Sequence, residues 1–591
     1  MTTAAPPTSA PPGGGAWLLE ATPQETVFTP ERLSDEQRLI HGTAEEFVAR
    51  EVIDQNDRLE TKDWDLARRL LRRCGELGLL GTDVPEAYGG LGLDKASSAL
   101  IAGSFGHAGS FSAAFGAQTG LVIMPIRAYG TEAQKRRYLP GLVGGETVGA
   151  YCLSESGSGS DALGAKTRAT RQPDGSFVLN GEKMWITNGG FADVYIVFAK
   201  VDGEHFTAFI VERAFEGVTS GAEEHKMGLL GSSTTPVILR DARVPAENVL
   251  GEIGRGHIVA FSVLNYGRFK LAASTVGGAR TAIGEAARYA ADRRQFGQPI
   301  ATFGAIRHKL GEMTLRTYAV EAMTFRTAGL LDAAIGGSDE DRTLVGALEE
   351  YAVESSILKV AGSETLDYIL DENVQIHGGN GYVKDYPAER HYRDSRVNRI
   401  FEGTNEINRL LIPGRLVRLA TKGRLPLIPA ARALRNELTA GTRPPEPGDG
   451  PLDAARGAVG MFRKAALAVI GLALERYGEK LGDEQEVLST AADILIDTYA
   501  AESAVARAGG AAEAGGAEAG LQVAAARAYV NDAALRIEVG ARTALAAMAE
   551  GDELRTNLAA LRRLLKVPPI DTVTIRRALA DKVVERGRYV F

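Results

Sequence analysis

The chain has little of several residue types, and each shortage excludes a class of protein. Only two of its 591 residues are cysteines, Cys74 and Cys152, so the sequence supports neither a disulfide framework nor a cysteine-based metal site. The formal net charge is −8, which argues against a dedicated nucleic-acid binder. No apolar run reaches the roughly 18 residues that a membrane-spanning helix needs, which leaves peripheral contact as the only expected membrane association. These features are typical of a protein in a reducing cytoplasm.

The composition that remains describes a globular protein of several domains. Hydrophobic residues make up 45% of the chain and charged residues 24%. Its length predicts three or four domains, because a single hydrophobic core rarely serves so many residues. The first 30 residues are rich in Ala, Pro, Thr and Gly and resemble neither a secretory signal nor a transit peptide, so we expect them to be mostly disordered. Order should begin near Ser34, a predicted helix cap.

Helical and strand periodicities alternate along the chain. Apolar residues recur at helical spacing at first, alternate as in strands from Val148 onward, and return to helical spacing after His257. A Pro/Gly-rich stretch then precedes an Ala-rich helical region of balanced charge. The predicted fold class is therefore mainly α with a central antiparallel, barrel-like β-domain. The predicted units are a disordered segment (1–30), a helical domain (31–147), a β-domain (148–256), a four-helix bundle (257–425), a linker (426–452) and a C-terminal helical domain (453–591).

Several local patterns make sharper predictions within these units. Asn180-Gly181 and Asp202-Gly203 are hairpin signals between strand-like runs. Long amphipathic helices are expected over residues 312–331 and 343–370. In the C-terminal region, the glycine pairs at 509–510 and 515–516 predict a loop between two helices.

The stretch Phe401-Glu402-Gly403-Thr404 is the strongest candidate for chemistry. Glu402 follows an apolar shoulder, where poor solvation should raise the pKa of its carboxyl toward the range of a general base. Gly403 allows a ligand to approach the backbone, whose N–H groups can bind a developing oxyanion. Thr404 is positioned to cap a helix that starts near Asn405. Taken alone, however, the motif is more typical of a surface glutamate at a helix start, and only the rest of the chain favours the catalytic interpretation.

Other patterns have a plain structural interpretation beside the functional one. The small residues between Phe111 and Gln118 indicate close helix packing or a cleft for a long, slim ligand. The Ser/Gly loop at 154–161 is weak evidence of phosphate binding, because such loops are usually turns. Trp185 alone is more typical of a core than of a cofactor contact. His377 has no second ligand at metal spacing, so we interpret it as structural or adjacent to a flavin.

Six motifs together resemble those of the acyl-CoA dehydrogenase family. Their order and spacing agree over about 270 residues, and the resemblance extends over roughly residues 30–425. The added C-terminal region resembles the very-long-chain branch and, more closely, bacterial long-chain enzymes. The motifs are Tyr151 to Asp161, Trp185-Ile-Thr-Asn188, Asn265-x-Gly-Arg268, Arg293-Arg-Gln-Phe-Gly297, Gln375-Ile-His-Gly-Gly379 and Phe401-Glu-Gly-Thr404.

The resemblance implies FAD as the cofactor and an acyl-CoA thioester as the substrate. Arg293, Phe296 and the loop from Gln375 are implied to reach the flavin of a neighbouring subunit, so a homodimer or homotetramer is expected. The implied cofactor-binding residues are Tyr151, Leu153, Ser154, Trp185, Ile186, Thr187, Arg293, Phe296, Gln375, Gly378, Gly379, Thr404 and Glu406. The implied substrate contacts are Ser160, Asn265, Arg268 and Gly403. Two departures from the common pattern, Ser154 for Thr and Ser156 for Pro, remove no functional group.

The resemblance also implies a reaction. Glu402 occupies the usual position of the base that takes the α-proton, and some relatives carry the base instead at the position of Gly267, where a glycine cannot serve. The expected product is a trans-2-enoyl-CoA of fatty-acid β-oxidation, formed from long-chain substrates, with hydride transfer to flavin N5 and electrons passed to electron-transferring flavoprotein. An acyl-CoA oxidase that uses oxygen remains an alternative. A DNA-binding homologue is a second one, although the C-terminal region lacks the necessary excess of basic residues.

Overall fold

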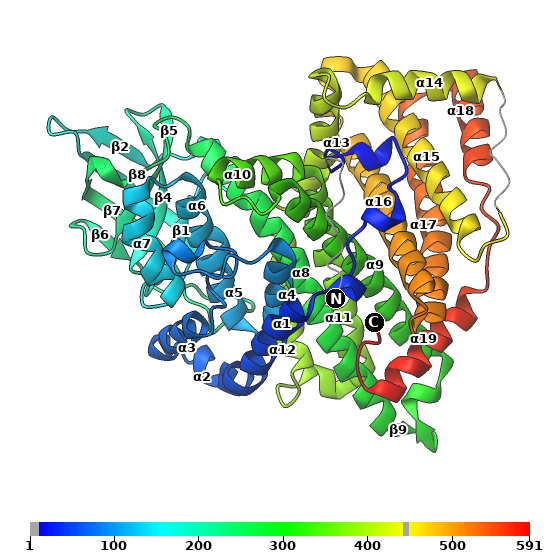
Figure 1. Ribbon diagram of the computed structural model, residues 1–591, viewed down its shortest axis with the longest axis horizontal. Coiled ribbons are helices and arrows are strands. Elements are labelled where there is room, and N and C mark those ends of the chain that lie inside the picture. Colours follow the sequence, from blue (N-terminus) through cyan, green and yellow to red (C-terminus); the bar gives the residue numbers. More distant parts are fainter. Residues whose placement is uncertain (1–10, 441–447) are drawn as a thin grey trace.

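A β-domain lies at one side of the molecule and helices form the rest, with the C-terminal helices at the opposite side (Figure 1). The computed structural model describes residues 11–440 and 448–591. The order of helical domain, β-domain, helical bundle and C-terminal helices agrees with the prediction of a mainly α fold with a central β-domain.

The N-terminal helical domain begins where its cap predicts. The Ser34 hydroxyl accepts a hydrogen bond from the Gln37 N–H, and the Gln37 side chain accepts one from the Ser34 N–H, which forms a capping box. The helices of this domain are α1 (Asp35–Phe47), α2 (Asn56–Glu60), α3 (Trp64–Glu76), α4 (Lys95–Ser104), α5 (Ser110–Gly116), α6 (Met124–Tyr129) and α7 (Glu132–Gly144).

The β-domain is built on an eight-stranded sheet in which most pairs are antiparallel. Two pairs differ from the antiparallel prediction, because β1 and β2 both run parallel to β4. The strands are β1 (Gly149–Cys152), β2 (Arg168–Arg171), β3 (Phe177–Thr187), β4 (Val194–Val201), β5 (His205–Glu212), β6 (Val218–Ser220), β7 (Thr234–Val244) and β8 (Val249–Leu250). Strand β4 is buried almost throughout, as a central strand with neighbours on both sides should be.

One of the two hairpin predictions is confirmed and the other is wrong. Asp202 and Gly203 both have positive φ and connect β4 to β5. Asn180-Gly181, in contrast, lies inside β3, where the pairing with β7 shifts register between Leu179 and Gly181. A Cβ atom at Gly181 would lie 2.3 Å from the Thr167 hydroxyl oxygen, so the glycine serves a bulge with a close contact instead of a turn.

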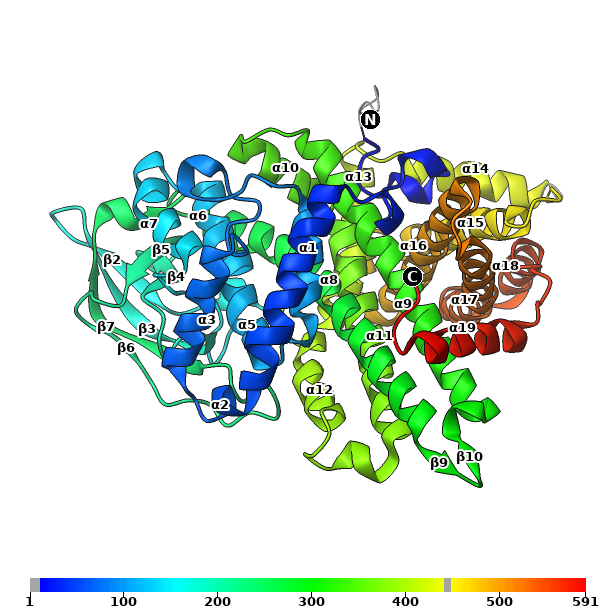
Figure 2. The ribbon, with the colours of Figure 1, turned by 60° about the horizontal axis from the view of Figure 1, so that its bottom comes forward.

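The helical bundle is organised around α8, which is a single continuous helix. Helix α4 crosses it so closely that a Cβ atom at Gly277 would lie 1.8 Å from the Gly103 carbonyl oxygen. The predicted helix over 343–370 is two helices separated at Tyr351. The bundle contains α8 (Gly256–Asp292), α9 (Gly304–Ile335), α10 (Asp341–Glu350), α11 (Ala352–His377), α12 (Ala388–Ser395) and α13 (Asn405–Thr421). A hairpin of β9 (Arg294–Gln295) and β10 (Gln298–Pro299) projects from it (Figure 2).

The C-terminal region packs against the bundle and differs from two expectations. Part of the predicted linker is helical, and residues 509–510 lie inside a helix whose end is Gly515. Residues 441–447 of the predicted linker lie outside the described residues. The helices are α14 (Leu427–Thr439), α15 (Asp453–Tyr477), α16 (Gln485–Ala514), α17 (Ala519–Met548), α18 (Gly551–Leu564) and α19 (Thr572–Arg586). The stretch Asp453–Asp483 is apolar and long enough to cross a membrane, but half of its most apolar window is buried inside the fold, as in a core helix.

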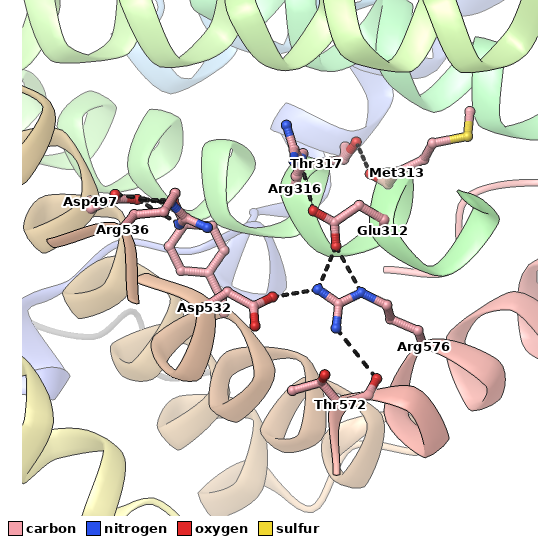
Figure 3. A network of polar contacts seen from close by, with 10 residues as sticks. Glu312, Met313, Arg316, Thr317, Asp497, Asp532, Arg536, Thr572 and Arg576 are labelled. Carbon is pink, nitrogen blue, oxygen red and sulfur yellow. Dashed lines mark hydrogen bonds and ion pairs between the residues drawn. The ribbon is translucent and has the colours of Figure 1, made fainter. Parts of the chain in front are cut away.

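Buried ion pairs connect the C-terminal helices to α9. Arg576 of α19 donates two hydrogen bonds to Glu312 Oε2 of α9, at 2.8 and 2.6 Å, and also pairs with Asp532 of α17 (Figure 3). Deeper in the interface, Arg507 of α16 pairs with Glu321 of α9 at 2.6 Å. Because breaking a buried pair leaves an uncompensated charge, these contacts specify how the region docks.

The N-terminal segment is ordered from residue 11, contrary to expectation, while residues 1–10 lie outside the described part. Trp17 is 4% exposed, packs on Tyr499 with ring centroids 5.0 Å apart, and donates its indole N–H to Glu354 Oε1 at 3.0 Å. The composition of the segment does not reveal this docking, because a few apolar anchors suffice when another domain provides the groove.

Replacing Trp17 by Ala should destabilise the protein, since the change removes a large buried side chain and one of the two hydrogen bonds donated to the Glu354 carboxylate, the other coming from the Gly15 N–H. We expect urea denaturation to show a loss of about 3–5 kcal/mol in the free energy of unfolding of the unit that contains α16. The control is Leu39→Ala, at a residue that is 73% exposed. Equal unfolding midpoints for the two variants would contradict the docking.

Candidate active site at Glu402

A long, narrow cavity runs beside α8 and ends at Glu402. Its volume is ≈ 180 Å³, and its wall on α8 extends from Gly267 to Gly278, which corresponds to about 16 Å at 1.5 Å per residue. Small and apolar side chains form much of the wall, although His107, His391 and Asp394 also line it. The small and apolar residues include Ala102, Gly106, Ala113, Gly116, Ala117, Gly120, Leu271, Leu366 and Leu370. Of the two interpretations of the small residues at 111–118, the structure thus supports a cleft.

The backbone at Glu402 is held in an unusual conformation. Glu402 and Gly403 have φ values of +57° and +80°, and a positive φ is strained for a glutamate. The Arg268 Nε–H donates to the Glu402 carbonyl oxygen at 3.0 Å, and the Asn408 amide donates to the Gly403 carbonyl oxygen at 2.8 Å. Thr404 then caps α13, as predicted, by accepting from the Ile407 N–H. These contacts stabilise the strained turn and aim the carboxylate into the cavity.

The electrostatics of Glu402 agree with the expectation of a poorly solvated carboxylate. Burial raises the pKa of Glu402 to about 7, although Arg268 and Lys359 oppose the shift by favouring the charged form. The Oε2 atom is buried and has no hydrogen-bond partner among the described residues. A carboxyl with a pKa near neutrality and a free oxygen facing a cavity is suited to proton transfer.

Gly267 makes room for this carboxylate. A Cβ atom at position 267 would lie 2.6 Å from Glu402 Oε2, closer than nonbonded atoms approach. The same glycine that cannot provide a base therefore allows Glu402 to occupy the end of the cavity.

The end of β1 and the end of β3 form a second wall near Glu402. The Met184 N–H donates to the Ser154 carbonyl oxygen at 2.9 Å, which brings the predicted residues Leu153 and Ser154 next to Trp185 and Ile186. Trp185 has a φ of +57° and is 58% exposed, which is unusual for a tryptophan.

The polar groups at this wall fit a planar cofactor. Thr187 lines the cavity together with Glu402, and the Tyr151 hydroxyl is buried without a partner among the described residues. The Ser/Gly loop beside them is fixed by the buried Lys183–Glu155 pair at 2.7 Å. An open aromatic ring, the Thr187 hydroxyl and the unpaired Tyr151 hydroxyl provide the stacking surface and the hydrogen bonds that a flavin ring requires.

A second group of predicted residues lies away from this cavity. Arg293 and Phe296 are on the projecting hairpin, where Phe296 is 92% exposed (Figure 2). Gln375, Gly378 and Gly379 are likewise exposed, at the end of α11. A single chain thus does not place these residues next to Trp185. They lie on a separate exposed surface.

The remaining predicted residues divide between surface and interior. Ser160 and Glu406 are exposed, whereas Asn265 and Arg268 are buried and joined by a hydrogen bond of 3.0 Å. The His377 ring is stacked on Tyr289, with centroids 4.2 Å apart, and its Nδ1 lies 2.8 Å from the Asn373 carbonyl oxygen, in agreement with the structural interpretation.

Two lysines, Lys359 near Glu402 and Lys270 at the cavity, were not found by the sequence analysis. Lys359 of α11 donates to Asn405 Oδ1 at 2.6 Å, and burial lowers its pKa to about 7 while Glu402 opposes the shift. Lys270 lines the cavity itself. Only its spacing of three residues from Gly267, which places both on one face of α8, could have indicated it.

A helical domain, a β-domain and a helical bundle that share a cavity with a glutamate at its end define the class. The chain belongs to the acyl-CoA dehydrogenase family. It matches family models described as the acyl-CoA dehydrogenase N-terminal domain (34–146), middle domain (150–242) and C-terminal domain (254–417), and a further C-terminal domain (461–563).

Similar proteins include both bacterial and mitochondrial enzymes. The chain is 49% identical to the probable acyl-CoA dehydrogenase of Bacillus subtilis over 98% of each chain. It is 38% identical to the human mitochondrial very long-chain specific acyl-CoA dehydrogenase, over 67% of this chain and 61% of that protein. The crystal structure of the Bacillus anthracis acyl-CoA dehydrogenase complexed with FAD matches with a TM-score of 0.97 and 48% identity, over 98% of this chain and 100% of that one.

Replacing Lys359 by Met should raise the pKa of Glu402 above about 7, because the carboxylate loses a nearby cation that favours its charged form. The pKa can be measured from the carboxyl stretch in pH-difference infrared spectra, assigned by its loss in Glu402→Gln. The control is Lys359→Arg, which keeps the charge. If the Met variant titrates with the wild-type midpoint, Lys359 does not act on Glu402.

Proposed function

We propose that this protein catalyses the FAD-dependent α,β-dehydrogenation of long-chain acyl-CoA to trans-2-enoyl-CoA, with Glu402 as the acceptor of the α-proton. The observation that carries the proposal is the position of the Glu402 carboxylate at the end of an apolar cavity, with a pKa of about 7. Membership of the family supports the reaction class.

FAD is the cofactor that this site fits. The similar Bacillus anthracis protein is described as a complex with FAD. In this chain, Trp185 and Thr187 together with Leu153 and Ser154 would hold the ring. When bound there, FAD supplies an acceptor for the hydride that leaves the β-carbon.

The residues of the chain account for proton removal. The α-proton of a thioester is too weakly acidic for a carboxylate in water, so the thioester carbonyl needs hydrogen bonds that strengthen as negative charge develops. We assign one of them to the Glu402 N–H. Arg268 holds the carbonyl of the same residue and thereby keeps this N–H and the carboxylate in one orientation. The acyl chain excludes water from the cavity, which strengthens these interactions.

Several features support a long acyl chain. The cavity extends for about 16 Å along α8, and each methylene buried in it contributes about 0.8 kcal/mol. The likeness to the very long-chain specific enzyme and the presence of the additional C-terminal helices point the same way.

We also infer that the active form is a homo-oligomer that reduces electron-transferring flavoprotein in the cytoplasm. Arg293, Phe296 and the loop from Gln375 to Gly379 are exposed in one subunit, which suits residues that complete a neighbour's flavin site. A charged guanidinium there would bind the pyrophosphate of FAD. Rapid consumption of oxygen by the reduced enzyme would instead indicate an acyl-CoA oxidase.

Replacing Glu402 by Gln should slow anaerobic flavin reduction by palmitoyl-CoA at least ~10²-fold, while FAD and acyl-CoA still bind, because the amide cannot accept the proton. In the wild type the rate should rise with pH through about 7, since the raised pKa keeps the carboxyl protonated and inactive below that value. The measurement is stopped-flow bleaching of the flavin, with the exposed Glu252→Gln as control. Near-normal bleaching by Glu402→Gln would reject the assignment.

Replacing Gly116 by Leu should shift the preferred chain length toward shorter substrates. A Cβ atom at this position meets no atom within 4 Å, so a larger side chain extends into the cavity and occupies space for the acyl chain. The measurement is kcat/KM for saturated acyl-CoAs from butyryl to palmitoyl, with Gly457→Leu on the exposed face of α15 as control. A wild-type maximum at butyryl with no turnover of palmitoyl would reject the long-chain preference.

A further inference from the structure

A lysine lines the apolar cavity one helical turn beyond the position where Gly267 faces Glu402. Lys270 lies three residues further along α8, on the same face, and its Nζ donates to the Thr119 hydroxyl at 2.8 Å. The rings of Phe115 and Tyr266 lie 5.5 and 5.6 Å from Nζ. None of the proton-transfer steps assigned above uses this ammonium group.

Within the part of the chain that the structure describes, Lys270 forms no ion pair, although Asp83 is near enough to favour its charged form. Among the described residues, no carboxylate lies within ion-pair distance of its Nζ, and Asp83 already pairs with Lys95. The Tyr266 hydroxyl donates to Asp83 Oδ2 at 2.6 Å, and Arg127 donates to the Asp83 carbonyl oxygen.

This corner of the cavity therefore carries an excess of buried positive charge. Lys95 and Arg127 are buried, and Lys270, Lys95 and Arg127 all favour the charged form of Asp83, while Asp332 is a second carboxylate that acts on Lys95. The nearest other acids serve the start of α4: Asp332 accepts from the N–H groups of Lys95 and Ala96, and Asp94 accepts from that of Ser97.

Lys270 remains a cation at neutral pH in spite of this environment. Burial lowers its pKa to about 8, Asp83 opposes the shift, and Lys95 adds to it. An ammonium group with one hydroxyl acceptor keeps two N–H donors for other partners. A desolvated cation without a counter-ion is unfavourable, and a ligand that brings an anion would offset the cost.

We propose that Lys270 is a binding subsite for a carboxylate at the far end of the acyl chain, so that the enzyme accepts ω-carboxyacyl-CoA thioesters of suitable length. The proposal rests on the proposed function, because it takes the cavity to hold the acyl chain. A plain chain continues past Lys270 along Leu271 and Ser274 toward Gly278, whereas a terminal carboxylate would stop at the ammonium group. The subsite sets which acyl chains are accepted and leaves the reaction at Glu402 unchanged.

The test compares pairs of acyl-CoAs with equal carbon number, from six to sixteen carbons, with and without a terminal carboxylate. For each pair the ratio of the two kcat/KM values is measured, because effects common to both substrates cancel in the ratio. In the wild type the ratio should pass through a maximum at one chain length, where the carboxylate reaches Lys270. At that length Lys270→Met, which keeps the shape but removes the charge, should lower the ratio by about 10–100-fold. Lys270→Arg, which keeps the charge, should preserve most of it.

Two results would overturn the subsite. One is a wild-type ratio that stays below about 10⁻³ at every length, since an unpaired carboxylate in an apolar cavity is excluded to that degree. The other is an unchanged ratio in Lys270→Met. If Lys270→Met fails to fold, the test rests on the kcat/KM ratios of the wild type across chain lengths and on those of Lys270→Arg. If plain acyl-CoAs do not reduce the flavin, the proposed function fails. In that case calorimetry gives the Kd of each acyl-CoA in the same pairs, and the ratio of the two Kd values tests the subsite separately from the reaction.

Discussion

The withdrawal of one carboxylate from water is the constraint on which the rest of the site depends. Glu402 combines a strained backbone, a buried oxygen without a partner and a pKa raised to about 7. Each of these is unfavourable for folding, and each is useful for taking a proton. Arg268 limits the cost because it binds the backbone carbonyl of Glu402 and leaves the carboxylate oxygens free to react. The absence of a side chain at Gly267 is as necessary as the presence of the arginine.

The buried charged groups that connect α9 to the C-terminal helices are, in contrast, paired. Along α9, Glu312 binds Arg576 and Glu321 binds Arg507, so carboxylates of the bundle meet guanidinium groups of the C-terminal helices. The contrast with Lys270, which has a hydroxyl as its hydrogen-bond acceptor, separates the two kinds of buried charge. Paired charges specify how domains dock. An unpaired charge at a cavity indicates a ligand.

The predictions from sequence succeeded where local chemistry decides the structure. The caps at Ser34 and Thr404 and the turn at Asp202-Gly203 follow from neighbours in the chain. The raised pKa of Glu402 was predicted from its apolar neighbours, but Ile400 and Phe401 are 53% and 37% exposed, and Gly267 of α8 lies against the carboxylate instead. The predictions failed where contacts with a segment far away in the sequence determine the structure. Asn180-Gly181 has the composition of a turn, but Thr167 and β7 hold it inside a strand.

The same distinction explains what was missed at the site and at the N-terminus. A lysine within a helical pattern is interpreted as solvent-exposed, and only the packing of residues 117–123 against α8 reveals that Lys270 lines a cavity. Trp17 is anchored by Tyr499 and Glu354, which are more than 300 residues away in sequence. No local composition could have indicated that partner.

The pair formed by Glu321 and Arg507 has a consequence for the time course of synthesis. Arg507 also binds Glu31 at 2.8 Å, so it joins the N-terminal segment, α9 and the C-terminal region. It follows Glu321 by 186 residues, and a ribosome adding roughly 5–20 residues per second needs about 10–40 s to cover that distance. During this interval Glu321 has Arg280 as a partner, at 2.8 Å, but lacks Arg507. The contact that joins the N-terminal segment, α9 and the C-terminal region therefore forms late in synthesis, and a nascent chain released before residue 507 would lack the arginine that joins them.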